Sequence, residues 1–243
     1  MVVIVTGATG GIGAQISRCL GMRGARLVLM DLEQETLDCL ADSFPGDAKP
    51  QTRRLDICDE EAVDNAVRDV AKKHGRLDAL VNAAGIYRVA PIAELSSADF
   101  LDTMAVNLTG PFFLTRAAAR IMSEAGGGRI VHLASVSSLV SNPEYGAYAT
   151  SKAALSQMIR VAARELAPKG VTVNAIGQAV TETPLTQKLL SDPERRADVL
   201  SQIPMGRLCE PEDIFAAVLF LLAPGGAFVT GQTLYIDGGR TLV

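Results

Sequence analysis

Short strand-like runs alternate with longer segments of helical periodicity along the whole chain. The runs are mostly rich in valine, isoleucine and leucine and are too short for helices. They lie at residues 2–6, 26–30, 52–56, 77–81, 129–135, 171–176 and 233–237. Apolar strands separated by helices are typical of a parallel sheet with helices on both faces. We therefore predict an α/β fold in which residues 1–243 form a single domain around one doubly wound sheet.

The segments between these runs predict helices over residues 14–23, after Asp59, up to Leu166 and from Pro211. A further long helical region includes residues 104–110, and Pro111 should disturb its backbone hydrogen bonds one turn earlier. Residues 184–204 are polar with an ambiguous helical pattern. We expect them to form a mobile lid over the substrate.

Composition and charge narrow the class of protein. The 243 residues are 48% hydrophobic and 21% charged, which fits a globular protein, and the net charge of −4 comes without a basic run for nucleic acid. The apolar stretch 215–223 is too short to cross a membrane, and the N-terminus does not resemble a signal peptide. We expect a soluble cytoplasmic protein that binds neither membranes nor nucleic acid.

Cysteine and histidine positions argue against a disulfide framework or a metal site. Cys19, Cys39, Cys58 and Cys209 are scattered, with no Cys-x-x-Cys pair, which indicates reduced thiols. The two histidines are far apart in the sequence. His132, inside an apolar run, is expected in the core, and His74, in a charged segment, at a solvated helix end.

The segment 145–152 contains the main chemical signal of the chain. Tyr148 and Lys152 are four residues apart, so on a helix they share one face. A nearby ammonium favours the phenolate form of a tyrosine, which would otherwise titrate near pH 10. An isolated pair of this kind is usually an ordinary packed ring beside a solvated lysine. Here Ser135 ends the preceding strand, at the edge where open α/β sheets bind ligands.

A glycine-rich turn follows the first strand, with glycines at 7, 11 and 13 before a helical segment. Such a turn lets backbone N–H groups approach a pyrophosphate at the helix N-terminus, although similar turns also serve packing alone. Asp31 ends the second strand, where a carboxylate can accept hydrogen bonds from ribose hydroxyls and repel a 2′-phosphate. It is also a favourable residue for capping the next helix.

Together these motifs resemble the short-chain dehydrogenase/reductase family, over nearly the whole chain. The resemblance implies a Rossmann-like sheet of about seven parallel strands, a homotetramer and hydride transfer between NAD(H) and a small alcohol or ketone. NAD rather than NADP is expected because Gly10 stands where NADP-preferring relatives usually carry a basic residue. The implied catalytic residues are Asn107, Ser135, Tyr148 and Lys152. The implied cofactor-binding residues are Gly7, Thr9, Gly11, Ile12, Gly13, Asp31, Leu32, Asp56, Ile57, Asn82, Ala83, Gly85, Tyr148, Lys152, Thr181 and Thr183.

The resemblance also assigns the roles of the catalytic residues. Tyr148 is the base that takes the alcohol proton, Ser135 binds the substrate oxygen, and Lys152 lowers the tyrosine pKa and binds the nicotinamide ribose. Asn107 stabilises a helix irregularity and holds a water for proton relay. From the residues alone, Asn107 is simply a polar residue inside a helix, and an acidic Asp56 could equally mark the start of a helix.

One departure from the family falls beside the expected nicotinamide site. The family typically has Pro-Gly there, whereas this chain has Gln178-Ala179. Losing proline frees the backbone, and glutamine adds hydrogen-bonding groups. We hypothesise that Gln178 loosens or re-aims the loop and faces the substrate. The pocket is expected to be lined by Val89, Val136, Ser137, Leu139, Tyr145, Leu185 and Leu189.

Two other functions stay open at this point. A reductase of carrier-bound 3-oxoacyl groups usually favours NADPH and has basic residues at its mouth, so Asp31 and the lack of a basic cluster argue against it. A non-catalytic NAD-binding regulator would typically have lost a catalytic side chain, and here all four are present. An epimerase or dehydratase of the extended branch should have a larger carboxyl-terminal domain.

Overall fold

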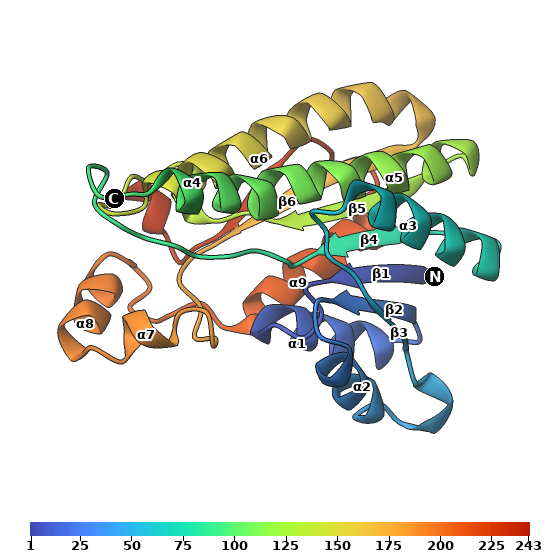
Figure 1. The fold of residues 1–243 in the computed structure, drawn as a ribbon, viewed down its shortest axis with the longest axis horizontal. Coiled ribbons are helices and arrows are strands. Elements are labelled where there is room, and N and C mark those ends of the chain that lie inside the picture. The colour runs from blue at the N-terminus through green and yellow to red at the C-terminus, as the bar shows by residue number, and fades with distance from the viewer.

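The fold is built on one parallel sheet. The computed structural model describes the backbone of residues 1–243 and every side chain except those of Asp47 and Lys188. Within this described chain, seven strands form a sheet in the order β3-β2-β1-β4-β5-β6-β7, and every neighbouring pair is parallel (Figure 1). The strands are β1 Val2–Thr6, β2 Arg26–Asp31, β3 Gln51–Arg54, β4 Ala79–Asn82, β5 Gly128–Leu133, β6 Val171–Gln178 and β7 Thr233–Ile236. The predicted doubly wound α/β fold is confirmed.

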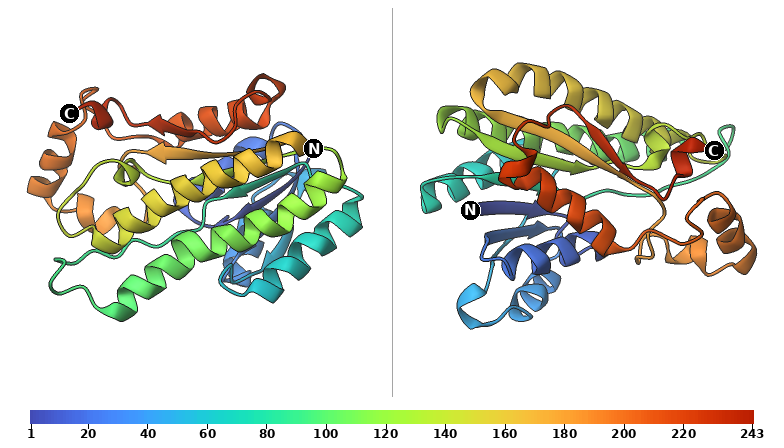
Figure 2. Two further views of the ribbon diagram at one scale, coloured as in Figure 1. Left: turned by 90° about the horizontal axis from the view of Figure 1, so that it is seen from above. Right: turned by 180° about the vertical axis from the view of Figure 1, so that it is seen from behind.

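Helices cover both faces of the sheet. They are α1 Gly11–Gly21, α2 Gln34–Asp42, α3 Glu60–His74, α4 Ser97–Met104, α5 Gly110–Glu124, α6 Gly146–Leu166, α7 Gln187–Leu190, α8 Pro193–Ser201 and α9 Pro211–Leu222. Short 3₁₀ turns are η1 Gly46–Ala48, η3 Val136–Ser138, η4 Ala167–Lys169, η5 Pro224–Gly226 and η6 Arg240–Leu242, and η2 Ala105–Thr109 is a π-helix. Helices α3, α5 and α6 lie on one face and α1, α2 and α9 on the other (Figures 1 and 2).

Alternate residues of each strand enter two separate cores, because successive strand side chains point to opposite faces. In β1, Val3 and Val5 pack with α1, α2 and α9. Val2 and Ile4 pack with α3, α5 and α6. Both faces of the central strands are therefore buried, which explains why these strands read as continuous apolar runs in the sequence.

The order of the strands positions the functional edge. The chain reverses direction across the sheet between β1 and β4, which lie side by side with Thr6 opposite Asn82. Parallel strands bring all their carboxyl ends to one edge, and open sheets bind ligands at such a switch point. Segment 184–204, which carries α7 and α8, projects beyond this edge, next to the C-terminus (Figures 1 and 2).

Pro111 disturbs the helical region where the sequence predicts it. The five residues before Gly110 form the π-helix η2, between α4 and α5. A proline has no N–H to donate to the preceding turn, and a π-bulge is one way to absorb that loss. The position of the irregularity was predictable, whereas its π geometry was not.

Several strand and helix limits differ from those predicted. β6 continues past Ile176 to Gln178, because its last residues still pair with β7 at Ile236. The first helix begins at Gly11, since Gly10 is its N-cap. Asp31 does not cap α2, whose N-cap is Glu33, and Asp56 does not cap α3, whose N-cap Asp59 accepts a hydrogen bond from the Ala62 N–H.

The two histidines lie in different surroundings. His132 is fully buried, His74 ends α3, and all four cysteines are free. Among the described residues, no cluster of three or more histidine, cysteine, aspartate or glutamate side chains is arranged to hold a metal ion. No helix in the described part of the chain is long and apolar enough to cross a membrane.

Candidate active site

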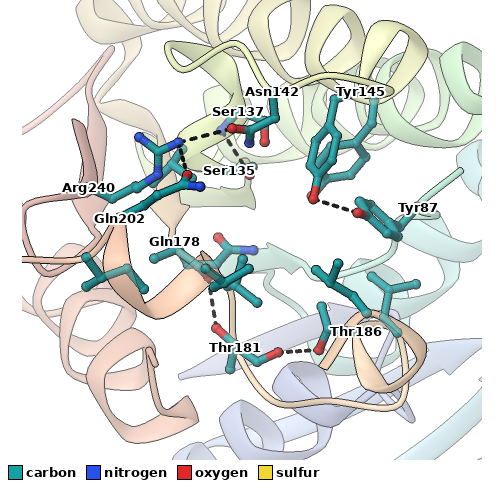
Figure 3. A pocket seen from close by; sticks show the side chains of 18 of the residues that line it. Tyr87, Ser135, Ser137, Asn142, Tyr145, Gln178, Thr181, Thr186, Gln202 and Arg240 are labelled. Atoms are coloured by element: carbon teal, nitrogen blue, oxygen red, sulfur yellow. Dashed lines mark hydrogen bonds between the residues drawn. The ribbon is translucent and has the colours of Figure 1, made fainter. Parts of the chain in front are cut away.

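A cavity of about 340 Å³ opens at the carboxyl ends of β5 and β6 (Figure 3). Its wall comes from segments far apart in the sequence, namely the glycine turn, the loops after β4, β5 and β6, helices α6 and α8, and the C-terminal turn. The lining residues are Ile12, Tyr87, Ser135, Val136, Ser137, Asn142, Pro143, Glu144, Tyr145, Tyr148, Gln178, Ala179, Val180, Thr181, Thr183, Leu185, Thr186, Leu189, Arg195, Asp198, Val199, Gln202, Ile203 and Arg240.

Three of the predicted catalytic residues meet at this cavity. Ser135 and Tyr148 line it, and the Lys152 ammonium lies 5.7 Å from the centre of the Tyr148 ring. Lys152 is buried, and its Nζ donates a hydrogen bond of 2.8 Å to the Leu133 carbonyl at the end of β5. The predicted shared face of Tyr148 and Lys152 therefore exists, and it points toward Ser135.

Burial moves the pKa values of this group away from their ordinary values. Loss of hydration raises the pKa of Tyr148 to about 12, and the Ser135 hydroxyl opposes this by stabilising the phenolate. Burial lowers the pKa of Lys152 to about 8. The Ser135 hydroxyl is therefore one side chain that favours the phenolate form of Tyr148.

Asn107 occupies the π-helix and is fully buried. Its Oδ1 accepts a hydrogen bond from the Ile86 N–H, and its Nδ2 donates to the Ile86 carbonyl and to the Ser151 hydroxyl. A side chain added at Gly85 would lie 3.2 Å from Asn107 Oδ1 and 3.5 Å from Lys152 Nζ. Asn107 thus joins the loop after β4 to the catalytic helix, one residue from the lysine.

The glycine turn forms a bare cradle at the start of α1. Gly7 has a φ of +64°, and a Cβ at Gly13 would lie 2.0 Å from the Gly7 carbonyl oxygen. No side chain caps α1, and its first turn has no acidic residue. The first N–H groups of a helix lack partners within the helix and attract anions. The turn therefore fits the pyrophosphate of a dinucleotide.

Asp31 faces this turn from the end of β2. One carboxylate oxygen accepts hydrogen bonds from the Thr9 N–H at 2.9 Å and the Thr9 hydroxyl at 2.6 Å, and the other accepts from the Leu32 N–H at 2.8 Å. A carboxylate has about four acceptor positions. Asp31 accepts three hydrogen bonds from the protein, which leaves an acceptor position for a ligand hydroxyl.

Some of the remaining predicted cofactor residues lie at the cavity or the glycine turn, and the others lie away from the cavity wall. Asn82 is buried and committed to the sheet, since its amide contacts the Thr6 hydroxyl, the Ala84 N–H and the His132 ring. Thr183 lies against the glycine turn, because a Cβ at Gly11 would be 3.0 Å from its methyl group. Ile12 and Thr181 line the cavity, whereas Leu32, Asp56, Ile57 and Ala83 lie outside its wall.

Comparison with known proteins identifies the family. A family model described as enoyl-(acyl carrier protein) reductase matches residues 7–241. Relatives named as dehydrogenases and reductases align over almost the whole chain. The chain belongs to the short-chain dehydrogenase/reductase family. It is accordingly an oxidoreductase of the kind that acts on CH–OH groups, as the motifs predict.

Three relatives and one solved structure illustrate the range of this similarity. D-threitol dehydrogenase of Mycolicibacterium smegmatis is 40% identical, over 99% of this chain and 93% of the relative. The 3-oxoacyl-[acyl-carrier-protein] reductase FabG of Thermotoga maritima is 37% identical, over 99% and 98%. Galactitol 2-dehydrogenase (L-tagatose-forming) of Cereibacter sphaeroides is 40% identical, over 98% and 94%. The crystal structure of gox2181 is 33% identical, has a TM-score of 0.96 and covers 100% and 96%.

The structure corrects the predicted pocket of this dehydrogenase/reductase at two positions. Val136, Ser137, Tyr145, Leu185 and Leu189 line the cavity as predicted, whereas Val89 and Leu139 do not. Leu139 ends η3 with its side chain turned to solvent, and Val89 lies beyond the cavity in the loop after β4.

The cavity wall contains two residues, Tyr87 and Arg240, that the sequence did not suggest. Tyr87 donates a hydrogen bond of 2.6 Å to the Tyr145 hydroxyl, and both rings pack edge-on against Tyr148. Opposite them, Arg240 Nη2 donates to Asn142 Oδ1 at 3.0 Å and to Gln202 Oε1 at 2.6 Å. Tyr87 and Arg240 both follow the ends of strands, so the rule that parallel strands present ligand sites at these ends would have suggested them.

The structure does not support the part of the hypothesis in which Gln178 loosens its loop, because Gln178 is the last residue of β6 and pairs with Ile236. The second half of the hypothesis agrees with the structure. Gln178 lines the cavity, and Figure 3 shows its amide extending into the space between Ser135 and the tyrosines.

Proposed function

We propose that the protein is an NAD(H)-dependent dehydrogenase that interconverts a secondary alcohol and a ketone. The observation that carries this proposal is the meeting of Ser135, Tyr148 and Lys152 at one cavity, beside a glycine turn built for a pyrophosphate. A phenol, a hydroxyl and an ammonium at one point supply a proton carrier, an oxygen-binding group and a positive charge.

Each side chain then has a distinct task. Tyr148, as phenolate, accepts the proton of the alcohol, and Ser135 donates a hydrogen bond to the substrate oxygen and favours the phenolate. Lys152, fixed by the Leu133 carbonyl, adds positive charge beside the tyrosine and binds the ribose of the cofactor. Asn107 positions the loop at Ile86 and serves the proton relay. The bound nicotinamide supplies the hydride acceptor or donor.

Asp31 supports the choice of NAD over NADP. A 2′-phosphate would bring negative charge next to a carboxylate that already accepts hydrogen bonds from Thr9 and Leu32. Two like unit charges at contact distance repel by about 1 kcal/mol even in water, and a phosphate carries up to about two charges. We expect at least a tenfold preference for NAD in kcat/KM.

The test is an absorbance assay at 340 nm with purified protein, using NAD and NADP in parallel against secondary alcohols and polyols. Turnover with NAD is expected, with a fall of about a hundredfold or more for Tyr148→Phe. Asp31→Ala should reduce the NAD preference, and Asp42→Ala, an exposed residue of α2, serves as its charge-matched control. A wild-type preference for NADP, or full activity of Tyr148→Phe, would contradict the proposal.

The relative from Thermotoga maritima favours a second candidate, reduction of carrier-bound 3-oxoacyl groups. The cavity wall argues against it, since Arg195 and Arg240 are balanced there by Glu144 and Asp198, which leaves no net positive charge for an acidic carrier. Reduction of an acetoacetyl carrier faster than any free ketone would favour this candidate. Binding of NAD without any turnover would favour a non-catalytic regulator.

We further propose a cytoplasmic homotetramer. Helices α5 and α6 present a groove with exposed Phe112 and Val161, and Phe228 is fully exposed before β7. Apolar patches of this kind commonly bind a second subunit. Light scattering should give four times the 25.6 kDa mass of the chain. A monomeric mass would refute this part of the proposal.

A further inference from the structure

The side chain of Gln178 combines two unusual properties. It lines the cavity beside the proposed catalytic residues, and its Oε1 is buried without a hydrogen-bond partner among the side chains that the structure describes. Buried polar atoms in folded proteins are nearly always paired, so an exception calls for an explanation. Because this oxygen is itself inaccessible, a ligand in the cavity would pair with it only after the amide turned over.

The register of the sheet places Gln178 next to Ser135. Leu133 of β5 pairs with Ile176 of β6, and the Ala134 N–H donates to the Ile176 carbonyl at 2.7 Å. Ser135 lies two residues past Leu133, in extended backbone just beyond β5, and Gln178 lies two residues past Ile176 at the end of β6, so both stand at the same edge of the sheet. Parallel neighbours are about 4.8 Å apart. One hydrogen bond from each side chain would therefore reach two oxygens on adjacent carbons of one substrate.

The chemistry of the amide selects a hydroxyl. One end of the glutamine amide accepts and the other donates, and rotation about its last bond exchanges them. A hydroxyl both donates and accepts, so it satisfies whichever end faces the cavity. A carboxylate satisfies only the donor end, and an alkyl group satisfies neither. The balanced charges of Glu144, Asp198, Arg195 and Arg240 also fit a neutral, polar ligand.

We propose that Gln178 binds the hydroxyl on the carbon next to the reacting carbon, and that the substrate is a vicinal diol within a short polyol. This inference rests on the proposed function, in which Ser135 and Tyr148 bind the oxygen that is oxidised. Gln178 thereby determines specificity without taking part in the proton transfer.

The experiment compares two alcohols that differ only in that hydroxyl, butane-2,3-diol in each stereoisomeric form and butan-2-ol, with NAD as cofactor. The wild-type protein is expected to prefer its best diol by at least about tenfold in kcat/KM, because a site built for a hydroxyl rejects the analogue that lacks it. Gln178→Met keeps the length of the side chain and removes both polar groups. It should bring the two kcat/KM values to within about threefold of each other.

Two further variants keep the test decisive. Gln232→Met makes the same change at an exposed position outside the cavity, and should leave the ratio at its wild-type value. Gln178→Asn retracts the amide by one methylene and replaces the methionine variant if that variant does not fold. Its ratio of kcat/KM for the diol to kcat/KM for butan-2-ol should lie between one and the wild-type value. The affinity for NAD, measured by quenching of tyrosine fluorescence, should be unchanged by Gln178→Met.

The outcomes separate this inference from the proposed function. Equal losses for diol and monohydroxy alcohol in Gln178→Met, or an unchanged ratio, would overturn the role of Gln178 while leaving the dehydrogenase function intact. A wild-type protein with no preference for the diol would do the same. Loss of NAD affinity with an unchanged ratio would show that Gln178 serves the cofactor. No oxidation of either alcohol by the wild-type protein, and no reduction of the matching ketones, would refute both proposals.

Discussion

His132 should make the stability of the protein sensitive to mild acid. It is fully buried in β5, where its Nε2 lies 2.8 Å from the Thr115 hydroxyl and its Nδ1 lies 3.3 Å from Asn82 Nδ2. Burial, and to a smaller extent the positive charge of Lys152, lower the imidazole pKa from 6.5 to about 3. Neither contact has a carboxylate that would stabilise an imidazolium, so the ring is neutral in the folded chain.

The sign and size of the effect follow from these two pKa values. The unfolded chain binds the proton below pH 6.5 and the folded chain only near pH 3, so the free energy of unfolding falls as the pH drops through 6.5. Each pKa unit is about 1.36 kcal/mol. Between about pH 7 and pH 5 the contribution of this one group is a loss of about 2 kcal/mol.

Urea unfolding followed by circular dichroism at pH 7 and pH 5 measures this loss. His132→Gln removes the titrating group while keeping one donor and one acceptor, so it should lose about 2 kcal/mol less than the wild-type protein over the same interval. His74→Gln removes the other histidine, at the end of α3, and should retain most of the wild-type loss. Identical pH dependence in the wild-type protein and His132→Gln would refute the reasoning.

Three more predictions concern the site. Ser135→Ala removes a hydroxyl that favours the phenolate form of Tyr148. The pH profile of kcat/KM for alcohol oxidation should therefore move to higher pH. An unmoved profile would show that Ser135 does not act on Tyr148. Gly13→Ala places a methyl group 2.0 Å from the Gly7 carbonyl oxygen. The rise in melting temperature caused by NAD should therefore be lost. A normal rise would contradict the proposal that the glycine turn binds the cofactor. Arg240→Met removes the hydrogen bonds to Asn142 and Gln202 across the cavity. The KM for the alcohol should therefore rise severalfold while the affinity for NAD stays unchanged. Equal changes in the KM for the alcohol and the affinity for NAD would contradict a role confined to the substrate end.

The sequence was sufficient for the sheet because its strands are buried on both faces. Apolar runs such as Val2–Thr6 have one structural interpretation in a chain that alternates with helices, and that interpretation was right. The placement of Ser135 after a strand and the shared helix face of Tyr148 and Lys152 were also predictable. Local spacing is enough wherever a single element sets the geometry.

What the sequence did not reveal depends on contacts between distant segments. The Arg240 contact with Asn142 joins positions 98 residues apart, and no local pattern encodes it. The extension of β6 to Gln178 depends on pairing with β7, which follows much later in the chain. The capping role expected for Asp31 gave way to its hydrogen bonds with Thr9, a tertiary contact that outweighs local helix preference.

The Arg240 bridge also affects how the protein is made. Residues from Ile12 to Arg240 line one cavity, so a chain emerging from the ribosome carries its glycine turn long before it can close the substrate end. During synthesis, the dinucleotide cradle at the start of α1 is complete in sequence while the wall that selects the alcohol is still missing. The cradle can take its folded shape only later, because Gly7 packs against Ala84 and Gly11 against Thr183. Both ends of the site therefore depend on residues from most of the chain.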